Sequence, residues 1–257
     1  MPRLRRAVAA AVPLLALLCP LPARAYRPFD QTDASVAETG ELEIELGPLG
    51  FVKDGADRSL VVPTLTLNWG FAERFELVLE AREVLQLGAV GGASRWRIDG
   101  AALSVKGVLR EGTLQERDGV SVASEVAALL PDPRGDSSGA GAQWALIASR
   151  RWTDATVHVN AAVAWARTHR LGVAGGVIVE VHDAWPIRPV AELVVEGERE
   201  APTLFSGLAG AIWRVREDLS LDAGLRLARA GGVSATEVRA GLTWAFGVGF
   251  PPVRRKS

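Results

Sequence analysis

Long segments in which apolar and polar residues alternate constrain the fold of this chain more than any other feature. Acids alternate strictly with aliphatic residues over residues 41–46, and the same period of two recurs over 75–82 and 219–227. Successive side chains of a β-strand point to opposite faces, so each segment has one hydrocarbon face and one polar face. The pattern predicts long β-strands whose two faces meet different surroundings.

Twelve such segments follow one another along the chain. They are residues 38–46, 60–69, 75–83, 98–109, 120–130, 141–152, 156–166, 173–182, 187–196, 204–214, 219–228 and 237–247. Most are longer than the usual strand of about five or six residues. A tilted strand that crosses a bilayer needs roughly 9–11 residues. The lengths favour an all-β fold, a transmembrane antiparallel up-and-down β-barrel of about 12 strands.

The connections between these segments support the same fold. Four even-numbered connections are short (70–74, 153–155, 183–186 and 215–218), whereas four odd-numbered ones are longer (47–59, 84–97, 131–140 and 229–236). Outer-membrane barrels have short periplasmic turns and longer outer loops. The connections at 110–119 and 168–172 break this rule, which leaves ten to fourteen strands open. A soluble β-sandwich in the periplasm remains the alternative fold.

The first 25 residues have the form of a secretory signal peptide. Arg3, Arg5 and Arg6 precede an apolar stretch over residues 7–18, and an Ala-x-Ala cleavage site ends at Ala25. We therefore expect a signal peptide over 1–25, a single β-barrel domain over 26–250 and a short basic tail over 251–257. The expected location is the outer membrane of a Gram-negative cell.

Composition excludes several other classes of protein. The four arginines of residues 1–25 leave 25 of the 29 bases, against all 30 acids, in the rest of the chain, so a nucleic-acid partner is not expected. The only cysteine is Cys19, within the predicted signal, which rules out a disulfide framework or thiolate metal site in the exported chain. The longest charge-free runs after the signal, 59–72 and 240–253, are shorter than the roughly 20 residues of a membrane-spanning helix.

Aromatic residues recur where predicted strands end. Amphipathic indole rings prefer the headgroup level of a membrane, so these residues predict an aromatic girdle, although single tryptophans can also fill a soluble core. The girdle candidates are Trp69, Trp152, Trp185, Trp213, Trp244 and Phe246.

If the apolar positions face lipid, the charged positions between them face the lumen. A charge facing the middle of a bilayer costs roughly 2–4 kcal/mol, which supports this assignment. The charged lumen-lining candidates are Glu41, Glu43, Glu45, Glu76, Glu80, Arg82, Lys106, Glu125, Arg151, His158, Glu180, Arg188, Glu192, Asp222, Arg226 and Arg239. They predict either a polar conduit or a network of ion pairs that fills a narrow barrel. In the second case, Arg226 and Arg239 are the expected partners of Glu41, Glu43 and Glu45, which form an acidic ladder on the first strand.

Catalytic and metal-binding patterns are weak. His158 and Asn160 share a strand face and His182 follows on the neighbouring hairpin, but the spacing places no serine beside His158 for nucleophilic catalysis. Two histidines without a third ligand are insufficient for zinc. We expect no catalytic residue, no metal and no cofactor, with a lipid-modifying barrel enzyme as the weakest alternative.

The hairpin over residues 68–77 (NWGFAERFEL), together with residues 149–154 and the strand around Ala191, resembles the bacterial outer-membrane barrels of the phenol-degradation meta-pathway transporter-like family. This resemblance implies a passive channel or uptake protein for small solutes, aromatic ones included, with outer-membrane lipid and the barrel-assembly machinery as partners. The alternative is a non-conducting structural or binding barrel filled by its own charged side chains. The aromatic end of the last strand, at either Phe246 or Phe250, looks like the segment that the assembly machinery recognises.

Overall fold

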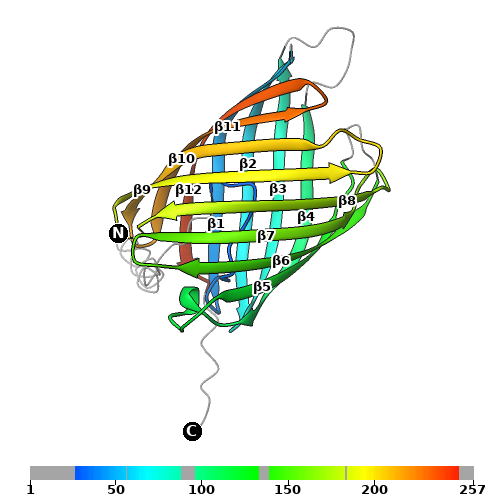
Figure 1. The fold of residues 1–257 in the computed structure, drawn as a ribbon. Coiled ribbons are helices and arrows are strands. Elements are labelled where there is room, and N and C mark those ends of the chain that lie inside the picture. The colour runs from blue at the N-terminus through cyan, green and yellow to red at the C-terminus, as the bar shows by residue number, and fades with distance from the viewer. Residues whose placement is uncertain (1–26, 56, 88–95, 133–138, 183, 249–257) are drawn as a thin grey trace, which may run out of the picture.

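The computed structural model describes residues 27–55, 57–87, 96–132, 139–182 and 184–248. These residues form a closed barrel in which each strand pairs antiparallel with its neighbours in sequence and the first strand closes on the last (Figure 1). The strands are β1 (Glu41–Asp54), β2 (Asp57–Ala72), β3 (Phe75–Leu87), β4 (Trp96–Arg110), β5 (Ser121–Leu129), β6 (Gly141–Arg151), β7 (Ala155–Trp165), β8 (Leu171–Val181), β9 (Ile187–Glu198), β10 (Leu204–Arg216), β11 (Leu219–Ala230) and β12 (Val233–Gly247). The predicted antiparallel barrel is confirmed, with twelve strands.

Two predicted loops are wrong. Residues 47–59 and 229–236 belong mostly to paired strands: Asp54 lies opposite Asp57, and Ala230 lies opposite Val233. Glycine, proline and charged residues at these positions interrupt the alternation, but the ladder continues through a register shift between Leu46 and Leu49. A β-bulge accommodates an extra residue without ending a strand. A prediction based on alternation alone therefore ends the strand too early.

The connection between β4 and β5 is long, although the alternation of short turns and long loops predicts a short one here. It is long because it has structure of its own. It contains a 3₁₀ helix, Thr113–Gln115, whose Leu114 is buried against Ala34, Ala123 and Ile147. This turn therefore folds over the mouth of the barrel. Among the described residues, no helix is both long enough and apolar enough to span a membrane.

The two faces of the wall differ as the alternation predicts. Leu193 and Phe205 point outward and are 70% and 61% exposed, whereas Glu192 and Ser206 beside them are buried inside. Directly paired residues share a face, so the register carries this inward set around the barrel. Large apolar side chains are therefore exposed on the outer face of the wall.

Exposed aromatic residues lie at both ends of the barrel wall. Among the girdle candidates, Trp152, Trp185, Trp213 and Trp244 are exposed at the end that carries the β2–β3 turn. Trp69 is half-buried next to Phe71, and the Phe246 ring lies 4.9 Å from that of Trp244. A second set occupies the opposite strand ends: Trp96, Trp144, Trp165 and Phe205.

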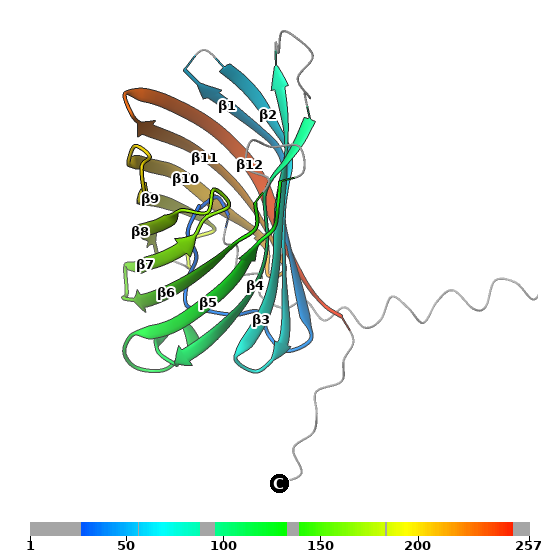
Figure 2. The ribbon, with the colours of Figure 1, turned by 90° about the vertical axis from the view of Figure 1, so that its right-hand side faces the viewer.

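Residues 27–40, which precede β1, run inside the ring of strands; we call them the inner segment (Figures 1 and 2). Gly40 closes the segment, with a φ of +83° that favours glycine, and its N–H donates to the carbonyl of Gly70 at 2.7 Å. The predicted signal peptide, most of the 131–136 loop, Phe250 and the basic tail lie outside the described residues.

Candidate functional site

The inner segment is held by side chains from the barrel wall. At its start, Nη1 of Arg27 donates to Oγ1 of Thr64 on β2 at 2.7 Å, and Nε lies 3.3 Å from the carboxylate of Asp222 on β11. These strands lie on either side of the β1–β12 seam, so Arg27 bridges the lumen side of that seam.

Glycines in the wall make room for the segment. A Cβ on Gly241 would lie 2.3 Å from Nε of Arg27, and one on Gly70 would lie 2.1 Å from the carbonyl oxygen of Glu38. Contacts under 3 Å cannot be accommodated without movement. Glycine is therefore required at Gly70, where the nearest atoms are backbone, whereas at Gly241 the end of the Arg27 side chain would have to move.

Asp30 is the ionic centre of the segment on the β11–β12 side. Its carboxylate pairs with Arg226 of β11 and accepts a hydrogen bond of 2.8 Å from Nη1 of Arg239 on β12. Burial by itself would raise the pKa of Asp30, but the guanidinium groups of Arg239 and Arg226 outweigh it, so the pKa lies below its usual value. The backbone N–H groups of Asp30 and Gln31 donate to the carboxylate of Glu192 on β9 at 3.0 and 2.8 Å.

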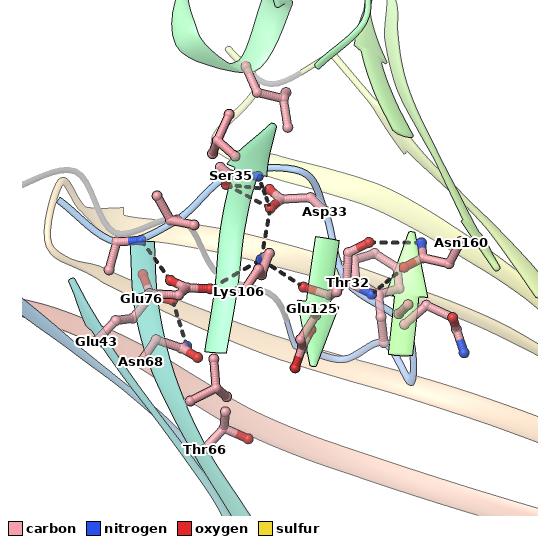
Figure 3. Close-up of a pocket in the computed structure, with 18 of the residues that line it drawn as sticks. Thr32, Asp33, Ser35, Glu43, Thr66, Asn68, Glu76, Lys106, Glu125 and Asn160 are labelled. Atoms are coloured by element: carbon pink, nitrogen blue, oxygen red, sulfur yellow. Dashed lines mark hydrogen bonds and ion pairs between the residues drawn. The ribbon is translucent and has the colours of Figure 1, made fainter. Parts of the chain in front are cut away.

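Lys106 of β4 is the ionic centre on the opposite side (Figure 3). Its ammonium group lies 3.2 Å from Glu76, 3.6 Å from Asp33 and 3.1 Å from the hydroxyl of Thr32. Glu76 also accepts the N–H of Ala37 at 2.7 Å. Because one lysine joins two carboxylates from the wall and the segment, it fixes the middle of the segment against β3 and β4.

A buried serine–histidine–glutamate array lies on the inner face of β6, β7 and β8. Nδ1 of His158 is 2.8 Å from Oγ of Ser149 on β6, and Nε2 is 3.1 Å from Glu180 on β8. Arg188 of β9 approaches the same glutamate at 3.4 Å, and the N–H of Ala34 donates to the Ser149 hydroxyl at 3.0 Å. The expectation that no serine lies beside His158 is wrong, because Ser149 pairs with His158 across the β6–β7 ladder.

The acidic ladder of β1 (Glu41, Glu43 and Glu45) does not meet the arginines that were predicted as its partners. Arg239 lies opposite Gly50, beyond the bulge, so it and Arg226 reach Asp30 rather than the ladder. The amide of Asn68 donates to Glu45 at 2.9 Å and to Glu43 at 3.4 Å.

A cavity of about 550 Å³ remains between the inner segment and the wall (Figure 3). Twelve of its lining residues are acids and two, Arg74 and Lys106, are bases. The acids come from the segment itself and from strands including β1, β3, β5 and β9. This cavity is the strongest candidate for a functional site, and it is markedly acidic.

Only some of the remaining lumen candidates line this cavity. Glu80 and Glu125 line the cavity, and Glu125 accepts a hydrogen bond from Ser104. Arg82 pairs with Asp99 at 2.6 Å where both are partly exposed. Arg151 lies at the turn end, 3.2 Å from Glu116. His182 stacks on Trp185 rather than meeting His158, and the described residues hold no cluster of three or more potential metal ligands.

Reasoning from the strand pattern missed the inner segment. Residues 27–40 do not alternate, so nothing in their pattern assigns them to a strand or to the lumen. The available signal was the charge balance: Arg27, Asp30 and Asp33 lie just before a strand wall that carries buried charges of both signs.

No family model and no curated protein sequence matches this chain. Solved structures match it in fold. An outer-membrane channel from Pseudomonas putida F1 superposes with a TM-score of 0.63 and 9% identity, covering 85% of this chain and 99% of the channel. The NanC porin gives 0.57 at 9% identity and the KdgM porin 0.52 at 9%, each covering 79% of this chain and 98% of the porin. At this identity the likeness shows the fold, an outer-membrane type of barrel.

Proposed function

We propose that this protein is an outer-membrane barrel that lets small polar solutes pass through its lumen without energy input. The observation that carries the proposal is the cavity of about 550 Å³ that stays open beside the docked inner segment. Pores select by diameter and by the groups that line them. The acid-rich lining favours polar solutes, whereas an aromatic solute follows only from the family resemblance. The channels and porins that share the fold support a conducting role.

The outer face supports placement in the outer membrane. Exposed aliphatic residues cover the middle of the wall and exposed tryptophans lie towards both ends, the arrangement that suits a bilayer with two interfaces. Outer-membrane lipid is then the immediate partner. The paired aromatic rings of Trp244 and Phe246 near the end of β12 fit recognition by the barrel-assembly machinery.

A second candidate is a non-conducting barrel sealed by its inner segment. The segment is bonded to opposite sides of the wall, from Lys106 of β4 and Glu76 of β3 to Glu192 of β9 and Arg239 of β12. A segment held this way reduces the free cross-section of a twelve-stranded barrel, which is already narrow.

Purified protein in liposomes and planar bilayers separates the two candidates. We expect discrete conductance steps and swelling with small sugars. A variant carrying Ala34→Cys and Ser149→Cys in a Cys19→Ser background would tie the segment to β6 by a disulfide. If the path runs beside the docked segment, conductance persists in the oxidised variant and matches that of the reduced one. Absence of any conductance from correctly folded protein would favour the sealed barrel.

A further inference from the structure

The inner segment divides the charges of the lumen into two groups. On the β11–β12 side, Arg226 and Arg239 both pair with Asp30, and Arg239 also lies 2.8 Å from Glu237. The guanidinium groups of this arginine pair are therefore neutralised by the segment as much as by the wall.

The cavity on the other side lacks such compensation. Its two bases are already engaged, Lys106 with Glu76 and Asp33, and Arg74 with Glu111 at 2.8 Å. Asp30 also borders the cavity but is held by the arginine pair. The other eleven acids of the lining face two bases, so nine acids remain in excess. A passage lined by one sign of charge with low-dielectric walls concentrates ions of the opposite sign.

We infer that the inner segment sets the charge selectivity of the barrel. Asp30 masks the arginine pair and leaves the acid-lined cavity as the open path, so cations and cationic small molecules pass in preference to anions. This inference rests on the proposed conducting function. It makes Asp30 a specificity-determining residue, although it belongs to no strand of the wall.

The test is the reversal potential of the full exported chain in planar bilayers under a KCl gradient. We expect the wild type to favour K⁺ over Cl⁻. Asp30→Asn removes the carboxylate but keeps the shape, which unmasks Arg226 and leaves Arg239 with Glu237 as its remaining carboxylate. The K⁺/Cl⁻ permeability ratio should therefore fall by about threefold or more. The matched control is Asp154→Asn in the exposed β6–β7 turn, which should leave the ratio unchanged.

Two further variants extend the test, and the first of them keeps the inference testable if Asp30→Asn folds poorly. Glu43→Gln with Glu45→Gln removes charge from the acid wall without touching the arginine pair, and should also lower the ratio. Adding Arg239→Gln to Asp30→Asn removes one of the two guanidinium charges and should restore part of the K⁺/Cl⁻ permeability ratio. A conducting wild type without cation preference, or an unchanged ratio in both Asp30→Asn and the double glutamate variant, overturns the inference alone. A folded wild type that does not conduct overturns the proposed function and this inference with it.

Discussion

Asp30 and Arg239 lie 209 positions apart in the chain and meet inside the barrel, where Oδ1 of the aspartate accepts a 2.8 Å hydrogen bond from Nη1 of the arginine. Arg226 joins them from the neighbouring strand. The pair links the residues before the first strand to the last strand, so docking of the inner segment depends on closure of the barrel.

The first prediction concerns how tightly this link holds the segment. Asp30→Asn leaves Arg226 and Arg239 without their carboxylate, which should weaken docking by about 1–3 kcal/mol. In a Cys19→Ser background, Gln31→Cys places a thiol inside the barrel, half-buried beside Gly176 of the wall. Its labelling by a bulky maleimide at neutral pH should be about tenfold faster, or more, in Asp30→Asn. Equal labelling rates in Asp30→Asn and in the Asp154→Asn control would show that the ion pair does not hold the segment.

The second prediction is a pH dependence with a defined sign. Because the pKa of Asp30 is lower in the folded barrel than in the unfolded chain, its carboxylate adds stability above its ordinary pKa. That stability is lost as the pH falls through the depressed folded pKa. The melting temperature of the wild type should therefore exceed that of Asp30→Asn at pH 7, and the difference should shrink below about pH 4. The loss of heat-modifiable gel migration measures both melting temperatures, and a difference independent of pH would contradict the assignment.

The third prediction tests whether the wall is shaped around the inner segment. Gly70→Ala places a methyl group 2.1 Å from the backbone oxygen of Glu38, so the segment has to move. Overpacking of this kind costs about 1–3 kcal/mol. The control is Gly247→Ala, where a Cβ meets no atom of the described residues within 4 Å. Only Gly70→Ala should lower the unfolding free energy and expose the Gln31→Cys thiol; equal behaviour of the two variants would contradict a wall fitted to the segment.

The sequence predicts the wall of this barrel far better than its contents. Alternation is a local property, so residues 219–227 identify β11 and its inward face without any knowledge of their partners. Ion pairs depend on register and on the shear of the whole barrel. The prediction that Arg239 meets the acidic ladder is therefore wrong, because the pairing of β1 with β12 places Arg239 opposite Gly50. The inner segment obeys no period at all, and its position follows from charges and glycines spread over many strands.

The last prediction concerns the buried array around His158. Its order resembles a nucleophile, a base and an orienting acid, but Ser149 is 1% exposed and its hydroxyl already accepts the N–H of Ala34. We expect a structural role: His158→Ala removes one hydrogen-bond partner each from buried Ser149 and Glu180 and leaves a cavity, which should cost about 2–4 kcal/mol of unfolding free energy in urea. His158→Gln, which can keep one hydrogen bond, should cost less.

A fluorophosphonate probe distinguishes this role from catalysis. The folded wild type should show no adduct at Ser149 by mass spectrometry, because a serine nucleophile has to be open to its substrate as well as paired with a base. Gly70→Ala gives a more demanding test, because its inner segment is expected to be displaced. The N–H of Ala34 should then no longer bond to the Ser149 hydroxyl. An adduct that requires both the displaced segment and an intact His158 would identify a latent hydrolase beneath the inner segment. Its absence from the displaced variant as well would leave the array as the structural anchor of Ala34.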